Sequence, residues 1–142
     1  MNRSHSPITV LGFDFGLKRI GVAVGQTMTQ TARPLIILNA NRGVPNWNDI
    51  QKLIDEWAVD ALVVGLPLNM DGTEQAITQQ ARAFAKTLEN KFHLPLYFSD
   101  ERLTTIAAKD ELHSQKSKKR FSAVDSVSAK LIVESWMDTD IT

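Results

Sequence analysis

The amino-acid sequence predicts a single α/β domain built on one mixed sheet. Three extended segments come first, of which the first is rich in β-branched and aromatic residues. Segments with helical periodicity then alternate with further strand-like segments. A meander of strands followed by alternating strands and helices favours a sheet that is antiparallel on one side and parallel on the other. One domain over residues 1–142 is expected, because no linker, repeat or low-complexity tract divides the chain.

The first three extended segments predict the antiparallel part of a five-stranded sheet. The segment ITVLGFDFG, which begins at Ile8, predicts a buried strand. A short polar turn at Lys18 and Arg19 leads to IGVAVG, and the two segments together predict a hairpin. The third segment, ARPLIILN, contains Pro34, which favours a sheet edge because proline lacks the backbone donor.

Two amphipathic helices are predicted in the middle of the chain, because apolar residues recur there at three- and four-residue spacing. These apolar residues are Trp47, Ile50, Leu53, Ile54 and Trp57 in the first helix, and Ile77, Ala81, Phe84, Leu88 and Phe92 in the second. We expect Asp71 or Thr73 to cap the second helix, since both types accept hydrogen bonds from a helix start.

The fourth and fifth strands are predicted from ALVVGL at 61–66 and PLYFS at 95–99. The first of these is an unbroken apolar run, typical of a parallel strand that is covered on both faces. A weaker helix is expected at about 103–112, and a last helix is expected to begin near Ser122. Helices therefore flank the predicted sheet.

The composition excludes several kinds of function. The chain has no cysteine, which excludes disulfides and thiolate metal sites, and it has no apolar run long enough to span a membrane. The N-terminal residues do not predict a signal peptide. We therefore expect a cytoplasmic protein without a membrane partner. Sixteen basic and sixteen acidic residues cancel, so the net charge does not indicate nucleic-acid binding. One cationic cluster remains, for which both a solvated loop and a phosphate-binding role stay open: Lys116, Lys118, Lys119 and Arg120.

Asp14 is the most informative acidic residue. It lies at the end of the first predicted strand, where an ionised carboxylate costs several kcal/mol of desolvation unless a positive charge compensates it. A metal ion is one such charge, and the glycines around Asp14 leave space for a ligand to approach. The alternative is that Asp14 pairs with Lys18 or Arg19 across the turn.

Two further acids are candidates for the same site. Glu101 follows the fifth predicted strand, and ligands of open α/β sheets bind beyond the carboxyl ends of strands. Its alternative role is a first-turn acid of a helix capped by Asp100. Asp125 lies in FSAVDSVSAK, where small residues one turn later leave room for ions. Its alternative role is a capping box with Ser122.

Together, the three acids predict metal-dependent phosphodiester hydrolysis. In this chemistry carboxylates hold two divalent ions about 3.5–4 Å apart, one activating the attacking water and the other stabilising the leaving oxygen. It requires no histidine, serine or cysteine. The three histidines of the chain lie in no motif that suggests a base or a zinc site, and no phosphate-binding loop or nucleophile elbow is present.

Four segments of the sequence form an ordered set: DFGLKRIGVAVG at 14–25, GLPLNMDGTE at 65–74, DERLTT at 100–105 and VDSVSA at 124–129. They resemble the signature segments of the YqgF family, whose bacterial members are also called RuvX, pre-16S rRNA nucleases or Holliday-junction resolvases. The resemblance extends from about Val10 to Trp136, and it implies a ribonuclease-H-like fold related to the junction resolvase RuvC. The acids of the family correspond here to Asp14, Glu101 and Asp125.

The function that the resemblance implies is nuclease action on the 5′ end of pre-16S rRNA, with Mg²⁺ or Mn²⁺ as cofactor and ribosomal precursor particles as partners. Asp14, Glu101 and Asp125 would hold the ions. The cations expected to bind substrate phosphates are Lys18, Arg19, Arg102, Lys116, Lys118, Lys119 and Arg120.

Three alternative functions stay open at this stage. A Holliday-junction resolvase would act on four-way DNA and would favour a homodimer over a monomer, since the reaction needs two matched cuts. A non-catalytic module would bind nucleic acid or the ribosome and merely retain the acids. An ATPase of the actin and Hsp70 kind opens with a similar turn, but it needs two such domains to enclose a nucleotide.

Overall fold

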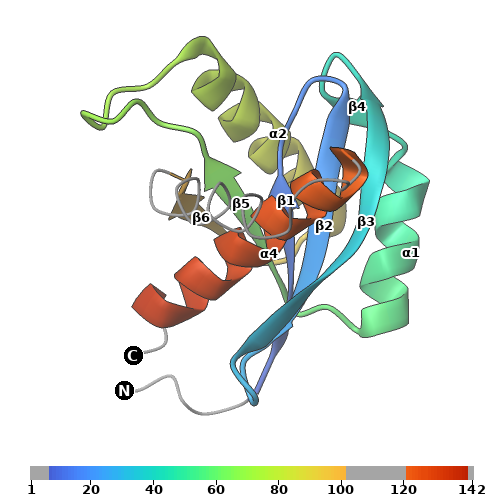
Figure 1. Ribbon diagram of the computed structural model, residues 1–142. Coiled ribbons are helices and arrows are strands. Elements are labelled where there is room, and N and C mark those ends of the chain that lie inside the picture. The colour runs from blue at the N-terminus through green and yellow to red at the C-terminus, as the bar shows by residue number, and fades with distance from the viewer. Residues whose placement is uncertain (1–6, 102–120, 141–142) are drawn as a thin grey trace.

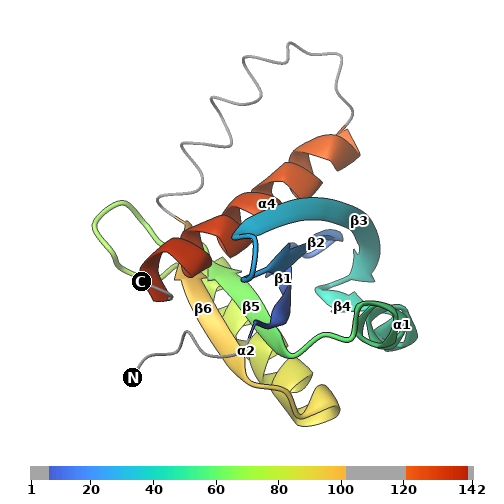
Figure 2. The same cartoon turned by 90° about the horizontal axis from the view of Figure 1, so that it is seen from below.

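The structure of the protein is a computed structural model that describes residues 7–101 and 121–140, with side chains described for 7–101 and 127–138. Within these residues, six strands form one sheet in the order β4-β3-β2-β1-β5-β6, and helices cover both of its faces (Figures 1 and 2). The strands are β1 (Thr9–Asp14), β2 (Arg19–Gln26), β3 (Thr31–Asn41), β4 (Val44–Pro45), β5 (Ala61–Leu66) and β6 (Leu96–Asp100). The helices are α1 (Trp47–Trp57), α2 (Ala76–Phe92) and α4 (Phe121–Asp140).

The sheet has the mixed topology that the order of elements predicts. β1, β2 and β3 form an antiparallel meander, whereas β1 pairs with β5, and β5 with β6, in parallel. The prediction of five strands is wrong by one, because β4 pairs with the end of β3 over only two residues. A two-residue turn joins these strands, with positive φ at both Arg42 and Gly43, and such a short strand leaves no hydrophobic pattern in the sequence.

The edge position predicted for Pro34 is confirmed over most of β3. Among the described residues, β4 pairs only with Ala40 and Asn41, so no strand lies outside β3 at Pro34. The register between β2 and β3 also shifts at this point, because Ala23 pairs with Pro34 while Val22 pairs with Ile36. Such a bulge increases the local bend of a strand, and β3 is strongly curved in Figure 2.

One face of the sheet packs against α1 and α2. Leu11 and Phe13 of β1 point into this core, and the ring of Phe13 meets that of Phe84 on α2 edge-on, with centroids 5.6 Å apart. Both helices occupy the predicted segments, but the predicted cap of α2 is wrong. Gln75 is the N-cap residue, and it forms a capping box with Thr78.

The other face of the sheet packs against α4, which crosses the strands in Figure 1. Val133 lies where side chains on Gly12 of β1 and Gly25 of β2 would otherwise stand, so the helix comes close to the sheet. The ring of Trp136 on α4 packs against that of Tyr97 on β6, with centroids 5.3 Å apart. No helix in the described part of the chain combines the length and apolar character needed to span a bilayer.

Candidate active site

Asp14 stands at the end of β1 on the face of the sheet that α4 covers. Successive side chains of a strand alternate between faces. Phe13 and Phe15 belong to the core under α1 and α2, whereas Val10 packs in the core under α4. Asp14 therefore shares the face of Val10 and Gly12, as the alternation in the sequence predicts, and it is half-buried.

Glu101 follows β6 directly, and its side chain lies across β5. Parallel pairing places Ser99 opposite Gly65 and Asp100 opposite Leu66, so Glu101, the next residue, lies near the carboxyl end of β5. A Cβ atom on Gly65 would stand 2.5 Å from Oε2 of Glu101 and 2.8 Å from its Cγ. Real Cβ atoms essentially never make such short contacts. The absence of a side chain at Gly65 therefore creates the space that Glu101 fills.

The two carboxyl groups lie together, and this changes the pKa of Glu101. Its pKa is raised to about 8. Burial is the largest cause, followed by the charge of Asp14, a hydrogen bond with Asp14, and the charge of Asp100. Two carboxyl groups can hydrogen-bond to each other only when they hold a proton between them. At neutral pH the metal-free site therefore retains a proton where a cation would otherwise compensate the charge.

The third predicted ligand, Asp125, belongs to α4, but its side chain lies outside the described residues. One turn later, the carbonyl oxygen of Ala129 lies 3.6 Å from the position of a Cβ atom on Gly12. This part of α4 thus crosses β1 two residues before Asp14. Because α4 begins at Phe121, Ser122 is already helical and is not the N-cap residue that a capping box requires.

The described side chains supply part of a metal-binding set of ligands. In residues 7–101 and 127–138, no three histidine, aspartate or glutamate side chains lie close enough to hold an ion. Asp14 and Glu101 nevertheless meet, and carboxylate oxygens are the donors that Mg²⁺ and Mn²⁺ prefer. The two described acids therefore fit such an ion as part of a larger set.

The predicted phosphate-binding cations are only partly described. Lys18 is exposed in the turn between β1 and β2, immediately beyond Asp14. Arg19 begins β2 and is half-buried. The remaining predicted cations lie outside the described residues, as does the helix predicted at 103–112: Arg102, Lys116, Lys118, Lys119 and Arg120.

The loop between β5 and α2 contains a turn and contributes no described metal ligand. Oδ1 of Asp71 accepts hydrogen bonds from the backbone nitrogen and the hydroxyl of Thr73, at 3.0 and 2.7 Å. The nitrogen of Gly72 donates to the carbonyl of Asn69 at 2.8 Å, and Gly72 has a φ of +90°. Asp71 and Thr73 thus stabilise a turn that precedes α2 by several residues, which is why neither of them caps the helix.

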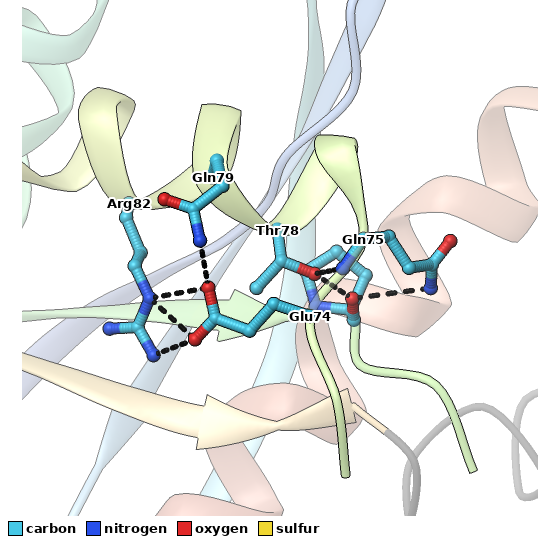
Figure 3. A network of polar contacts seen from close by, with 6 residues as sticks. Glu74, Gln75, Thr78, Gln79 and Arg82 are labelled. Atoms are coloured by element: carbon cyan, nitrogen blue, oxygen red, sulfur yellow. Dashed lines mark hydrogen bonds and ion pairs between the residues drawn. The ribbon is translucent and has the colours of Figure 1, made fainter. Parts of the chain in front are cut away.

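The same loop is fixed to α2 by a polar network that the sequence analysis did not predict (Figure 3). Nη2 of Arg82 lies 2.6 Å from Oε2 of Glu74, and this hydrogen bond is the largest cause that lowers the pKa of Glu74. The hydroxyl of Thr78 donates to the carbonyl of Pro67 at the start of the loop. Both ends of the loop are therefore held to α2, beside the strand end where Glu101 lies.

Gly65 is the other functional position that the sequence analysis missed. Its signal is a glycine within the apolar run ALVVGL, where every neighbour is a large or branched residue except the first alanine. A glycine inside a strand often marks a close approach of another group. The sequence alone does not identify that group as Glu101, which lies 36 positions later by number.

One protein-family model matches nearly the whole chain. The model of the RuvX family, described as Holliday junction resolvase, matches residues 8–139. The chain belongs to the RuvX family. Its relatives include proteins named "Putative pre-16S rRNA nuclease". The one from Aeromonas salmonicida is 54% identical over 132 residues, 92% of this chain and 94% of the relative. The one from Haemophilus ducreyi is 52% identical over 134 residues, which are 93% of this chain and 97% of the relative.

Solved structures of junction resolvases share the fold of this RuvX-family chain. RuvC of Thermus thermophilus in complex with a Holliday junction substrate aligns with a TM-score of 0.58 at 17% identity, over 93% of this chain and 97% of RuvC. The fowlpox virus Holliday junction resolvase aligns with a TM-score of 0.54 at 12% identity, over 93% of this chain and 99% of the resolvase. The predicted ribonuclease-H-like fold and the predicted family are thus confirmed.

Proposed function

We propose that this RuvX-family protein is a divalent-metal-dependent nuclease whose ions are held by Asp14, Glu101 and Asp125. The observation that carries the proposal is the contact between Asp14 and Glu101 at the carboxyl ends of β1 and β6. Two adjacent carboxylates are unfavourable unless a proton or a cation lies between them, as the raised pKa of Glu101 indicates. Such pairs are frequent where proteins bind metal ions for catalysis.

Asp125 completes the proposed set of ligands. It lies four residues, or about one helical turn, before Ala129, and Ala129 lies over Gly12. Asp14 lies two residues beyond Gly12 in β1, so the helix backbone brings residue 125 towards the same end of the sheet. Three carboxylates from two strand ends and one helix supply enough oxygen donors for hard divalent ions.

The ions proposed are Mg²⁺ or Mn²⁺, in a two-ion arrangement. When bound, they would lower the pKa of the attacking water and stabilise the leaving oxygen. The chain itself contributes the ligands and the binding of substrate phosphates. For phosphate binding we propose Lys18 and Arg19 at the turn beside Asp14, together with Arg102 and the cluster of cations at 116–120.

The proposed substrate is the 5′ end of pre-16S rRNA, with ribosomal precursor particles as partners in the cytoplasm. The names of relatives that are 52–54% identical over more than nine-tenths of the chain support this choice. Cleavage of four-way DNA is the second candidate. It is supported by the description of the family and by the fold shared with Thermus thermophilus RuvC. That reaction would favour a homodimer on the substrate.

The test is cleavage of a pre-16S rRNA fragment and of a four-way DNA junction, each with Mn²⁺ and with chelator. Asp14→Asn, Glu101→Gln and Asp125→Asn should each lower the rate by at least about 10³-fold, since each removes a charged metal ligand. Glu56→Gln, at an exposed position on α1, is the matched control and should cleave like the wild type.

The substrate that the wild type cleaves with Mn²⁺ decides between the RNA and the junction. If it cleaves neither substrate faster than the three variants, the catalytic proposal fails. A protein that then still binds either nucleic acid would be a non-catalytic binding module.

A further inference from the structure

Arg82 on α2 contacts two segments that precede and follow this helix in the sequence. Its Nε–H group is shared between the two carboxylate oxygens of Glu74, at 3.0 and 3.2 Å, and its Nη2 lies 2.6 Å from Oε2 (Figure 3). The same guanidinium lies over the ring of Phe98 on β6, with Cζ 5.4 Å from the centroid. Several contacts to one carboxylate fix the orientation of both planar groups. Arg82 thus holds the β5–α2 loop and β6 to the same turn of α2.

Glu74 connects this guanidinium to the end of β5. The loop folds back on itself as a short hairpin, in which Leu68 forms an antiparallel bridge with Glu74. The nitrogen of Asn69 donates to the carbonyl of Thr73 at 2.9 Å, which closes the hairpin beyond this bridge. Leu68 follows Leu66, the last residue of β5, by only two positions. Contacts that hold Glu74 in place therefore also hold the end of β5.

Phe98 connects the guanidinium to the strand that leads to Glu101. Phe98 pairs with Val64 of β5 and lies three residues, about 10 Å, before Glu101. The side chain of Glu101 fills the space over Gly65, one residue before the end of β5. Glu101 therefore lies where β5 and β6 end together, and Arg82 contacts the segments that hold both of these strand ends.

The sheet separates Arg82 from the candidate metal site. Arg82 packs on the face of the sheet that α2 covers, where its guanidinium meets Phe98. Glu101 lies over Gly65 on the side of α4, since a Cβ atom on Gly65 would also meet Cδ1 of Ile132 on that helix. The guanidinium is therefore not placed to bind a phosphate between the acids. Its effect on the site has to pass through the strands.

We infer that Arg82 is a positioning residue for Glu101. Through its two contacts it holds the ends of β5 and β6 at the spacing at which Glu101 reaches Asp14. This inference rests on the proposed function, because it assigns to Arg82 a part in the affinity of the site for its ions. Loss of Arg82 leaves every proposed ligand in the chain but lets Glu101 shift. A site whose ligands are displaced binds its ion more weakly.

The first test measures the affinity for Mn²⁺ by calorimetry, without substrate. Arg82→Gln and Glu74→Gln each break the pair, and each should weaken Mn²⁺ binding about tenfold. Arg33→Gln is the matched control, because Arg33 is exposed on β3 and its Cζ also lies over a ring, that of Trp57 on α1, at 4.9 Å. This control removes the same charge and the same kind of ring contact elsewhere on the sheet, and it should bind Mn²⁺ like the wild type.

The directions of the two changes separate positioning from the effect of charge alone. Loss of a positive charge near the site would strengthen the binding of a divalent cation, whereas loss of a negative charge would weaken it. Charge alone therefore predicts opposite changes for Arg82→Gln and Glu74→Gln, and positioning predicts the same loss for both. The double variant should bind as weakly as either single variant, because both remove one contact. Tighter binding by Arg82→Gln would overturn the inference.

Cleavage kinetics at saturating Mn²⁺ test the step from position to catalysis. Arg82→Gln should lower kcat about tenfold and leave KM unchanged, because the guanidinium does not meet the substrate. A higher KM with an unchanged kcat would make Arg82 a substrate-binding residue and would overturn the inference. The assays are run well below the melting temperature of each variant, so that a loss of folded protein does not imitate a loss of rate.

Hydrogen exchange supplies a measurement that needs neither metal nor cleavage. The amides of the hairpin at 68–74 and of β6 should exchange faster in Arg82→Gln than in the wild type, and Arg33→Gln should leave them unchanged. If the wild type neither binds Mn²⁺ nor cleaves while these amides still respond, the proposed function fails and the anchoring by Arg82 stands. If the wild type binds Mn²⁺ and cleaves, and Arg82→Gln does so equally well, the inference alone fails.

Discussion

Replacement of Gly65 by alanine should slow the proposed cleavage reaction about 10²-fold, although Gly65 has no side chain. The added Cβ atom would stand 2.5 Å from Oε2 of Glu101 and 2.5 Å from Cδ1 of Ile132. Ordinary van der Waals contact begins at 3.4 Å, so Glu101 has to move by about 1 Å. For a catalytic group, the role proposed for Glu101, a displacement of this size can lower a rate about 10²-fold. The same crowding should lower the free energy of unfolding by about 1–3 kcal/mol.

The matched control for this variant is Gly25→Ala. Gly25 pairs with Val10 near the beginning of β1, far from Asp14, and its Cβ atom would meet Cγ1 of Val133 on α4. Gly25→Ala therefore crowds the same helix without touching Glu101. Initial cleavage rates with Mn²⁺, binding of Mn²⁺ by calorimetry and unfolding in urea are measured for both variants. The reasoning is refuted if Gly65→Ala cleaves like the wild type, or if Gly25→Ala loses as much activity.

Three further predictions concern the charge and the packing of this end of the sheet. Without metal, the free energy of unfolding should fall as the pH rises, because the pKa of Glu101 is raised from 4.5 to about 8 in the folded protein. The contribution of Glu101 to this free energy is fully present below about pH 4.5, and it is lost as the pH rises through about 8. Urea unfolding across this range checks the prediction, and a flat profile would contradict it. Glu101→Gln should flatten this dependence on pH and raise the melting temperature of the metal-free protein at pH 8, because it removes a buried charge beside Asp14. Differential scanning calorimetry measures both effects, and an unchanged profile would count against the contact between Glu101 and Asp14. Gly43→Ala should destabilise the fold by about 1–3 kcal/mol in urea, since it strains a φ of +81° and crowds Phe15, whereas an unaffected variant would show that the turn is free to move.

The sequence predicts the parts of the fold whose hydrophobic pattern is long enough to be periodic. The helix from Trp47 to Trp57 and the buried strand ALVVGL are found where the pattern places them. β4 is missed because a turn, and not a hydrophobic pattern, determines where it forms. A strand of two residues is too short to show the alternation of apolar and polar residues. The cap of α2 is mispredicted because Asp71 is already engaged with Thr73, a local competition that composition does not reveal.

The sequence predicts which residues belong to the candidate site better than it predicts the contacts that hold them in place. Asp14 is found from one strand, since a carboxylate between two core phenylalanines needs an explanation. Glu101 is found only in combination with the other acids, because a first-turn acid of a helix is an equally good local explanation. Its contact with Gly65 joins distant parts of the chain, and a single sequence contains no signal for such a pair. Asp125 remains a prediction, as its side chain lies outside the described residues.

The close packing of α4 against Gly12 and Gly25 has a consequence for how such an enzyme would evolve. Val133 occupies the space above both glycines. Asp125 lies eight residues earlier in the same helix, about 12 Å away along its axis. A methyl group on Gly12 would stand 2.2 Å from Cγ2 of Val133, so it would hold this part of α4 further from β1. Asp125 would then also stand further from the end of β1 that bears Asp14. The spacing of these two proposed ligands therefore depends on a glycine that would not touch the ion.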